Sequence, residues 1–148
     1  MTHPVIVEVT RGGIVESLHR GSYAVVDGKG RVVASAGDID VPIFPRSAIK
    51  ALQCLPVIES GAADGFGFSD EEIALICSSH NGEPRHVAAA RSMLAKAGLD
   101  EEAYECGAHW PGETEALHAM IRADEEPGQV HNNCSGKHAG MLAVAQQL

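Results

Sequence analysis

The feature that most constrains the fold is a change of sequence pattern after residue 36. Residues 5 to 10, 22 to 27 and 31 to 36 are rich in β-branched residues and are separated by glycines, as is typical of short strands. The Asp-Gly-Lys-Gly segment at 27 to 30 predicts a hairpin between the last two of them. From residue 46 onward, apolar residues recur at helical spacing instead. Strands followed by helices predict an α+β fold with an antiparallel sheet, not the alternation of a parallel sheet.

Five helices are expected in the second part of the chain, over residues 46 to 59, 70 to 77, 83 to 97, 113 to 123 and 135 to 148. Ser69 and Glu72 have the spacing of a capping box at the start of the second helix. The last helix ends at Leu148 without a stop signal. We therefore expect residues 1 to 148 to be part of a single domain whose chain is incomplete.

Composition and charge exclude several classes of protein. The 148 residues carry a formal net charge of -9 and no basic stripe, which argues against nucleic-acid binding. No basic and apolar leader begins the chain and no run of 18 apolar residues occurs, so we expect neither export nor a membrane span. Four cysteines without CxxC spacing suit reduced thiols in the cytoplasm.

A serine and a lysine stand three residues apart where the first helix begins. Pro45 leads into the segment, and Ser47 and Lys50 share a helix face at i and i+3. This spacing lets the lysine amine hydrogen-bond the serine hydroxyl, and a desolvated lysine can act as a general base. An N-capping serine beside a solvated lysine has the same spacing.

A second polar group follows the apolar run at residues 73 to 77. Ser79 and Asn81 form an S-x-N segment, which accompanies S-x-x-K in penicillin-binding proteins and β-lactamases. Only folding could bring Ser79 to Ser47. Capping of neighbouring helices is the alternative role for these side chains.

Cys134 and Lys137 stand at i and i+3 at the start of the last predicted helix. A thiolate at a helix N-terminus beside a lysine would be acidified and could bind metal. From spacing alone a structural free thiol is favoured over a metal site. His109 lies next to Trp110 in a short polar loop and is expected to be a packed or capped loop histidine.

Four stretches together resemble the asparaginase II family, typified by the inducible, thermolabile Rhizobium enzyme. They are FPRSAIKALQ, SSHNGEPRHV, CGAHWP and NNCSGKHAGML. The resemblance covers the whole chain but only the N-terminal half of a family member. It implies a fold similar to serine β-lactamases and penicillin-binding proteins, in which an antiparallel sheet is flanked by helices.

The resemblance also implies an activity, namely hydrolysis of L-asparagine to L-aspartate and ammonia in asparagine catabolism. Two serine and lysine pairs would act. The first is Ser47 with Lys50, and Ser79 is the serine of the second, whose lysine lies beyond Leu148. Arg46, His80 and Asn81 would help to hold the substrate.

Zinc is the cofactor that the resemblance implies. Cys134 and Lys137 match two of its ligands, and a further cysteine lies beyond Leu148. The complete protein is expected to be a cytoplasmic homodimer, and residues 1 to 148 alone are expected to be inactive.

Alternatives of two kinds remain open at the level of sequence. One is a related S-x-x-K hydrolase, a glutaminase or a β-lactamase-like enzyme, and the other is a non-catalytic fragment. Which serine is the nucleophile is also open, although Ser47 is favoured because its base is present and it lies at a helix start.

Overall fold

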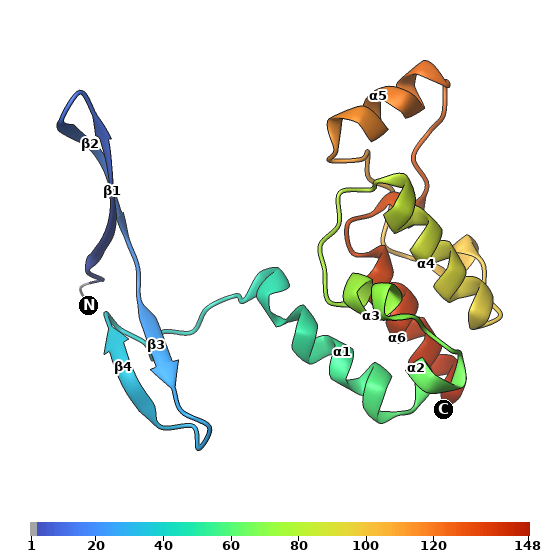
Figure 1. Cartoon of the computed structure of the whole chain (residues 1–148), viewed down its shortest axis with the longest axis horizontal. Helices are drawn as coiled ribbons and strands as arrows, with labels where there is room; N and C mark the ends of the chain where they lie inside the picture. Colours follow the sequence, from blue (N-terminus) through green and yellow to red (C-terminus); the bar gives the residue numbers. More distant parts are fainter. Residues whose placement is uncertain (1–2) are drawn as a thin grey trace. The chain divides into compact units, whose positions relative to one another are not determined.

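The computed structural model describes residues 3 to 148, which divide between Phe44 and Pro45 into two compact units. The first contains four strands in two small antiparallel sheets, and the second contains six α-helices and three short 3-10 helices (Figure 1). The predicted α+β class is confirmed.

The first unit consists of two hairpins. Strand β1 (Val5–Arg11) pairs with β2 (Ile14–Arg20), and β3 (Tyr23–Val26) pairs with β4 (Val32–Ala36). The predicted turn joins β3 to β4. Strand β2 was not predicted, although the Gly-Gly pair before it has positive φ angles of 57° and 80°, as a tight hairpin turn requires.

Apolar side chains of these hairpins remain exposed. Ile14 is 74% exposed and Val33 is 61% exposed. A two-stranded sheet has no second layer of its own, so within this unit neither face is covered.

The second unit is helical, and its elements follow the predicted helices closely. They are η1 (Arg46–Ile49), α1 (Lys50–Glu59), α2 (Ala62–Gly65), α3 (Asp70–Ile76), α4 (Pro84–Lys96), η2 (Glu101–Ala103), α5 (Thr114–Arg122), η3 (Gln129–His131) and α6 (Ser135–Gln147).

The local sequence explains where α3 begins and why α2 was not predicted. Ser69 Oγ accepts a hydrogen bond from the Glu72 amide and the Glu72 carboxylate accepts one from the Ser69 amide, so the predicted capping box is confirmed. Helix α2 is a single turn in a glycine-rich segment that was predicted to be a loop. One turn is too short to produce a periodic pattern.

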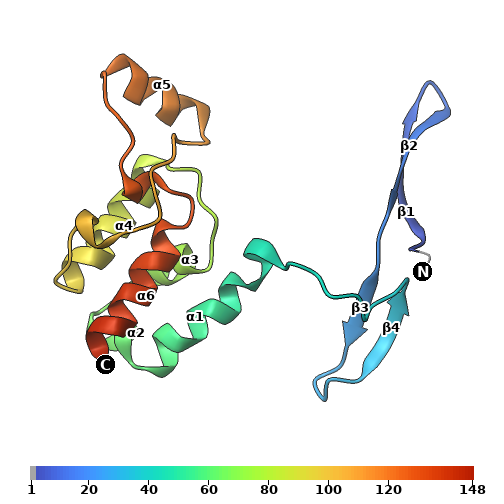
Figure 2. The same ribbon diagram turned by 180° about the vertical axis from the view of Figure 1, so that it is seen from behind.

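Helix α6 is the central element of the helical unit, and it packs against α1, α2, α3 and α4 (Figures 1 and 2). Its contact with α3 is close at Gly136, where an added Cβ would lie 2.5 Å from Leu75 Cγ and 2.8 Å from the Leu75 carbonyl oxygen. The core around these helices includes the fully buried side chains of Ile76, Met93 and Leu94. This packing holds the end of α3 against the start of α6.

None of the helices within residues 3 to 148 combines the length and the apolar character that a membrane crossing would need.

Candidate active site

A chain of hydrogen bonds joins the predicted lysine to one predicted serine through the other. Lys50 Nζ donates to Ser79 Oγ at 2.9 Å, and Ser79 Oγ lies 2.8 Å from Ser47 Oγ. These residues come from η1, the first position of α1 and the loop after α3. The tertiary structure therefore brings together Ser47, Lys50 and Ser79, which are separated by up to 32 residues in the sequence.

Lys50 is 2% exposed, which is unusual for a lysine. Its Nζ also donates to the carbonyl oxygens of Ser78 and of Asn133, the latter at 3.4 Å. The buried amine therefore has three hydrogen-bond acceptors around it.

The expected direct bond between Lys50 and Ser47 is replaced by an indirect connection. Ser79 Oγ stands between the two side chains, and the Lys50 amine is directed toward Ser78, Ser79 and Asn133. The tertiary structure causes this difference. The three acceptors lie in loops whose positions cannot be predicted from the spacing of Ser47 and Lys50.

Ser47 is exposed and follows a strained residue. Arg46 has φ 53°, a left-handed conformation that is uncommon outside glycine. Such strain gathers at functional sites, where the surrounding structure maintains it. Arg46 is itself exposed beside Ser47.

The turn after Ser79 is held by His80, which is 5% exposed. His80 Nδ1 accepts from the Gly82 amide at 3.1 Å, and its Nε2 lies 2.8 Å from Ser135 Oγ. A ring that accepts at Nδ1 carries its proton on Nε2, so the imidazole is neutral and donates to Ser135. Burial, followed by the charges of His86, Lys50 and His131, lowers the pKa of His80 to about 4.

Ser79, His80 and Asn81 line a cavity of about 240 Å³ together with His109, Trp110, Gly112, His131 and Asn133. His131 and Asn133 were not identified as site residues from the sequence, although Asn133 lies within the stretch NNCSGKHAGML and His131 directly precedes that stretch. Their closeness to Ser79 follows from the His80 amide donating to the Asn133 carbonyl oxygen at 3.2 Å.

Cys134 and Lys137 lie at the start of α6, next to Asn133 and Ser135. Burial, followed by the charge of Cys134, raises the pKa of the Cys106 thiol, and the charge of Lys137 opposes that rise. Across residues 3 to 148, no group of three or more His, Cys, Asp or Glu side chains is arranged to hold a metal ion. The donor set of the described residues therefore falls short of a zinc site, and we derive no catalytic step through a metal.

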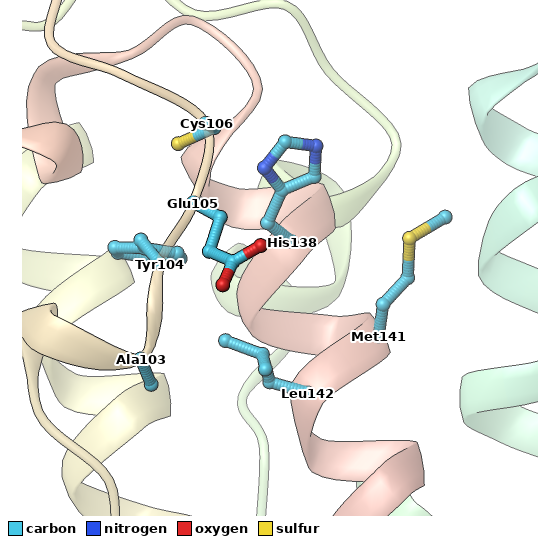
Figure 3. A pocket seen from close by; sticks show the side chains of 7 residues that line it. All are labelled: Ala103, Tyr104, Glu105, Cys106, His138, Met141 and Leu142. Atoms are coloured by element: carbon cyan, nitrogen blue, oxygen red, sulfur yellow. The ribbon is translucent and has the colours of Figure 1, made fainter.

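A larger pocket, of about 490 Å³, lies elsewhere on the helical unit (Figure 3). Its walls are the loop carrying Tyr104, Glu105 and Cys106 and the face of α6 carrying His138 and Met141. It contains none of the hydrogen-bonded serines or Lys50. The smaller polar cavity is therefore the better candidate for substrate.

An exposed serine connected to a buried lysine amine through a second hydroxyl is typical of hydrolases that act by acyl transfer. The family model described as L-asparaginase II matches residues 7–148. The chain belongs to this family, and membership indicates an amidohydrolase with L-asparaginase-like activity. No curated protein matches the chain.

Proposed function

We propose that this protein hydrolyses L-asparagine to L-aspartate and ammonia through an acyl-enzyme formed on a serine. The observation that carries this proposal is the hydrogen-bonded series from Lys50 through Ser79 to Ser47. Family membership supports the substrate class.

The proposed acylation moves two protons along this series. Ser47 Oγ attacks the side-chain amide carbon of asparagine while its proton passes to Ser79 Oγ, and the proton of Ser79 passes to Lys50 Nζ. Lys50 must be neutral at that moment, because only the free amine can accept a proton. The carbon–nitrogen bond then breaks, the leaving nitrogen takes up the proton, and ammonia departs.

Deacylation follows the same path. Water attacks the ester carbonyl and gives a proton to Lys50 through Ser79. The bond between the carbonyl carbon and Ser47 Oγ then breaks, Ser47 Oγ takes that proton back through Ser79, and L-aspartate is released. We favour Ser47 as the nucleophile because it is at the end of the series, whereas Ser79, which is also exposed, is bonded on both sides and is suited to a relay.

Substrate and metal contacts are the further parts of the proposal. Arg46 and Asn81 are exposed beside the two serines and would hold the substrate, and His80 supports the same turn. Cys134 and Lys137 would be two of the zinc ligands, and at least one more ligand would have to come from outside the described residues.

The proposed setting is a cytoplasmic homodimer with a fold like that of serine β-lactamases. The free thiols of Cys54, Cys77, Cys106 and Cys134 support a reducing compartment. Light scattering of the purified protein would test the dimer.

The decisive experiment compares ammonia release from L-asparagine and L-glutamine with the opening of a β-lactam ring. We expect turnover of asparagine at a kcat/KM well above that of the other two substrates. Preference for glutamine or the β-lactam would indicate the related hydrolases instead. Absence of turnover with all three in the whole protein would contradict the enzyme proposal.

A further inference from the structure

The polar cavity beside Ser79 is built from three separate segments. One wall is the turn from Ser79 to Asn81, the second is the loop of His109 and Trp110, and the third runs from His131 to Asn133. Ser79 belongs both to this cavity and to the hydrogen-bonded series that ends at Ser47. A ligand in the cavity therefore lies next to the reacting hydroxyls.

Backbone hydrogen bonds join the three walls. The Asn81 carbonyl oxygen accepts from the Gly112 amide at 2.8 Å, and the Asn133 carbonyl oxygen accepts from the His80 amide at 3.2 Å. The Asn132 side-chain amide donates to the Cys106 and Gly107 carbonyl oxygens at 2.8 and 3.0 Å. The cavity is thus formed in advance of ligand binding, which lowers the cost of association.

Close packing also fixes the turn. Gly82 has φ 72° and approaches Pro111 so closely that an added Cβ would lie 3.0 Å from Pro111 Cα. Only glycine meets both conditions, so this position keeps the first wall against the second.

The lining of the cavity offers hydrogen-bond donors and contains no carboxylate. His131 Nδ1 accepts from the Gly128 amide at 3.1 Å, so its Nε2 carries the proton and is a donor. The side-chain amide of Asn81 adds a further donor, and the Lys50 amine lies behind Ser79, whose hydroxyl donates to Ser47. Donors without a nearby acid favour an anionic oxygen ligand.

We propose that this cavity binds the α-carboxylate of the amino-acid substrate, with His131 and Asn81 as residues that determine specificity. The proposal rests on the proposed asparaginase function and identifies which end of the substrate is recognised. With the carboxylate in the cavity, the side-chain amide is presented to Ser79 and Ser47. Substrates whose α-carboxylate is blocked should therefore be rejected at the binding step.

The test measures binding apart from turnover. In the whole protein carrying Ser47→Ala, calorimetry would compare L-asparagine with asparagine α-amide, which has a neutral carboxamide in place of the carboxylate. We expect the α-amide to bind at least about tenfold more weakly, the scale of losing one charge-assisted hydrogen bond. Trp110, the single tryptophan of the chain, should report the same binding by fluorescence, and Trp110→Phe would assign the signal.

Variants of the lining identify the residues responsible. His131→Ala and Asn81→Ala should each reduce the preference for the carboxylate form, whereas His118→Ala, which changes an exposed histidine of α5, should leave it unchanged. Circular dichroism would identify any variant that fails to fold. The variant that does fold then shows whether the lining determines the preference for the carboxylate.

Two results would overturn the proposal: equal affinity for asparagine and its α-amide, or a full preference retained in both lining variants. If wild type releases ammonia from asparagine while affinity is equal, the cavity assignment fails and the enzyme proposal stands. If the carboxylate preference holds but wild type releases no ammonia, the cavity assignment stands and the enzyme proposal fails.

Discussion

Lys50 is the residue on which the geometry of the candidate site depends. Its amine connects α1 to the loop after α3 and to the loop before α6 through Ser78, Ser79 and Asn133. An amine buried to this degree is tolerated because it has hydrogen-bond acceptors around it. The same bonds place Ser79 against Ser47.

The serine and lysine series should behave as one catalytic unit. We expect Ser47→Ala and Lys50→Ala each to lower kcat/KM for asparagine by at least about a thousandfold, because the nucleophile and its base depend on each other. The double variant should be little worse than either single one. Ammonia release measures the effect, and near wild-type turnover in Ser47→Ala would reject the assigned nucleophile.

His80 should make stability depend on pH. Its pKa is about 4 in the folded protein and 6.5 in the unfolded chain, so the unfolded state binds more protons between these values. The free energy of unfolding should fall by up to about 3 kcal/mol as the pH drops from 6.5 to 4, and this contribution should level off below pH 4.

Urea denaturation at several pH values tests this, with His80→Gln as the variant and His118→Gln, at an exposed site, as the control. The pH dependence of the free energy of unfolding should weaken in His80→Gln and should stay unchanged in His118→Gln. An identical pH profile in all three proteins would show that His80 does not contribute.

Cys134 provides a test of the metal proposal. Cys134→Ser should lower the zinc content of the whole protein while leaving helicity intact, because one ligand changes at the start of α6 and not within the core. Metal analysis with circular dichroism is the measurement. Zinc content equal to that of wild type would identify Cys134 as a structural thiol.

At the scale of elements, the contact between α3 and α6 determines where the catalytic loop lies. Ser78 and Ser79 follow α3 directly, and Gly136 of α6 packs against Leu75 near the end of that helix. A displacement of α3 from α6 would therefore move Ser79 relative to Ser47 and Lys50.

Gly136→Ala should destabilise the protein. Alanine favours a helix by about 1 kcal/mol over glycine, but its Cβ would meet the Leu75 carbonyl oxygen at 2.8 Å, and a backbone atom cannot move aside cheaply. Overpacking typically costs about 1–3 kcal/mol, so after the helix gain we expect a net loss of up to about 2 kcal/mol.

Thermal unfolding would measure this loss, and Gly28→Ala, at an open turn position, is the matched control. A melting temperature for Gly136→Ala at or above that of wild type would contradict the packing argument.

At the scale of the whole molecule, the hydrogen-bonded series lies entirely in the helical unit, which begins at Pro45. The hairpin unit before it exposes apolar side chains such as Ile14, Val26 and Val33. Exposed apolar surface of this kind promotes association.

We predict that residues 1 to 148 expressed alone release no measurable ammonia from asparagine and aggregate readily. The resemblance to the asparaginase II family implies a second catalytic lysine and a further zinc ligand that were not assigned to any of these residues, and catalytic groups that act as a unit lose most of the rate when one is absent. Ammonia assays and light scattering are the measurements. A soluble, cooperatively melting and active product would contradict this prediction.

Local sequence determined most of the elements. Periodicity and capping residues predicted five helices, and β-branched runs with a glycine turn predicted three of the four strands, because these signals act over a few residues. The omissions were α2, which is a single turn, the short 3-10 helices η2 and η3, and β2, whose signal was the glycine pair before it. The family was also identified from the local motifs around Ser47, Ser79 and Cys134, and the match over residues 7–148 confirmed it.

Only the tertiary structure decided how the site residues meet. Spacing along one helix predicted a bond from Lys50 to Ser47, but the fold inserts Ser79 between them and adds the Asn133 carbonyl oxygen as an acceptor. His131 and the cavity beside Ser79 likewise come from loops far apart in the chain. The physical reason is that a buried amine takes its partners from whatever segments pack around it, and packing between helices is not encoded in the spacing of any one of them.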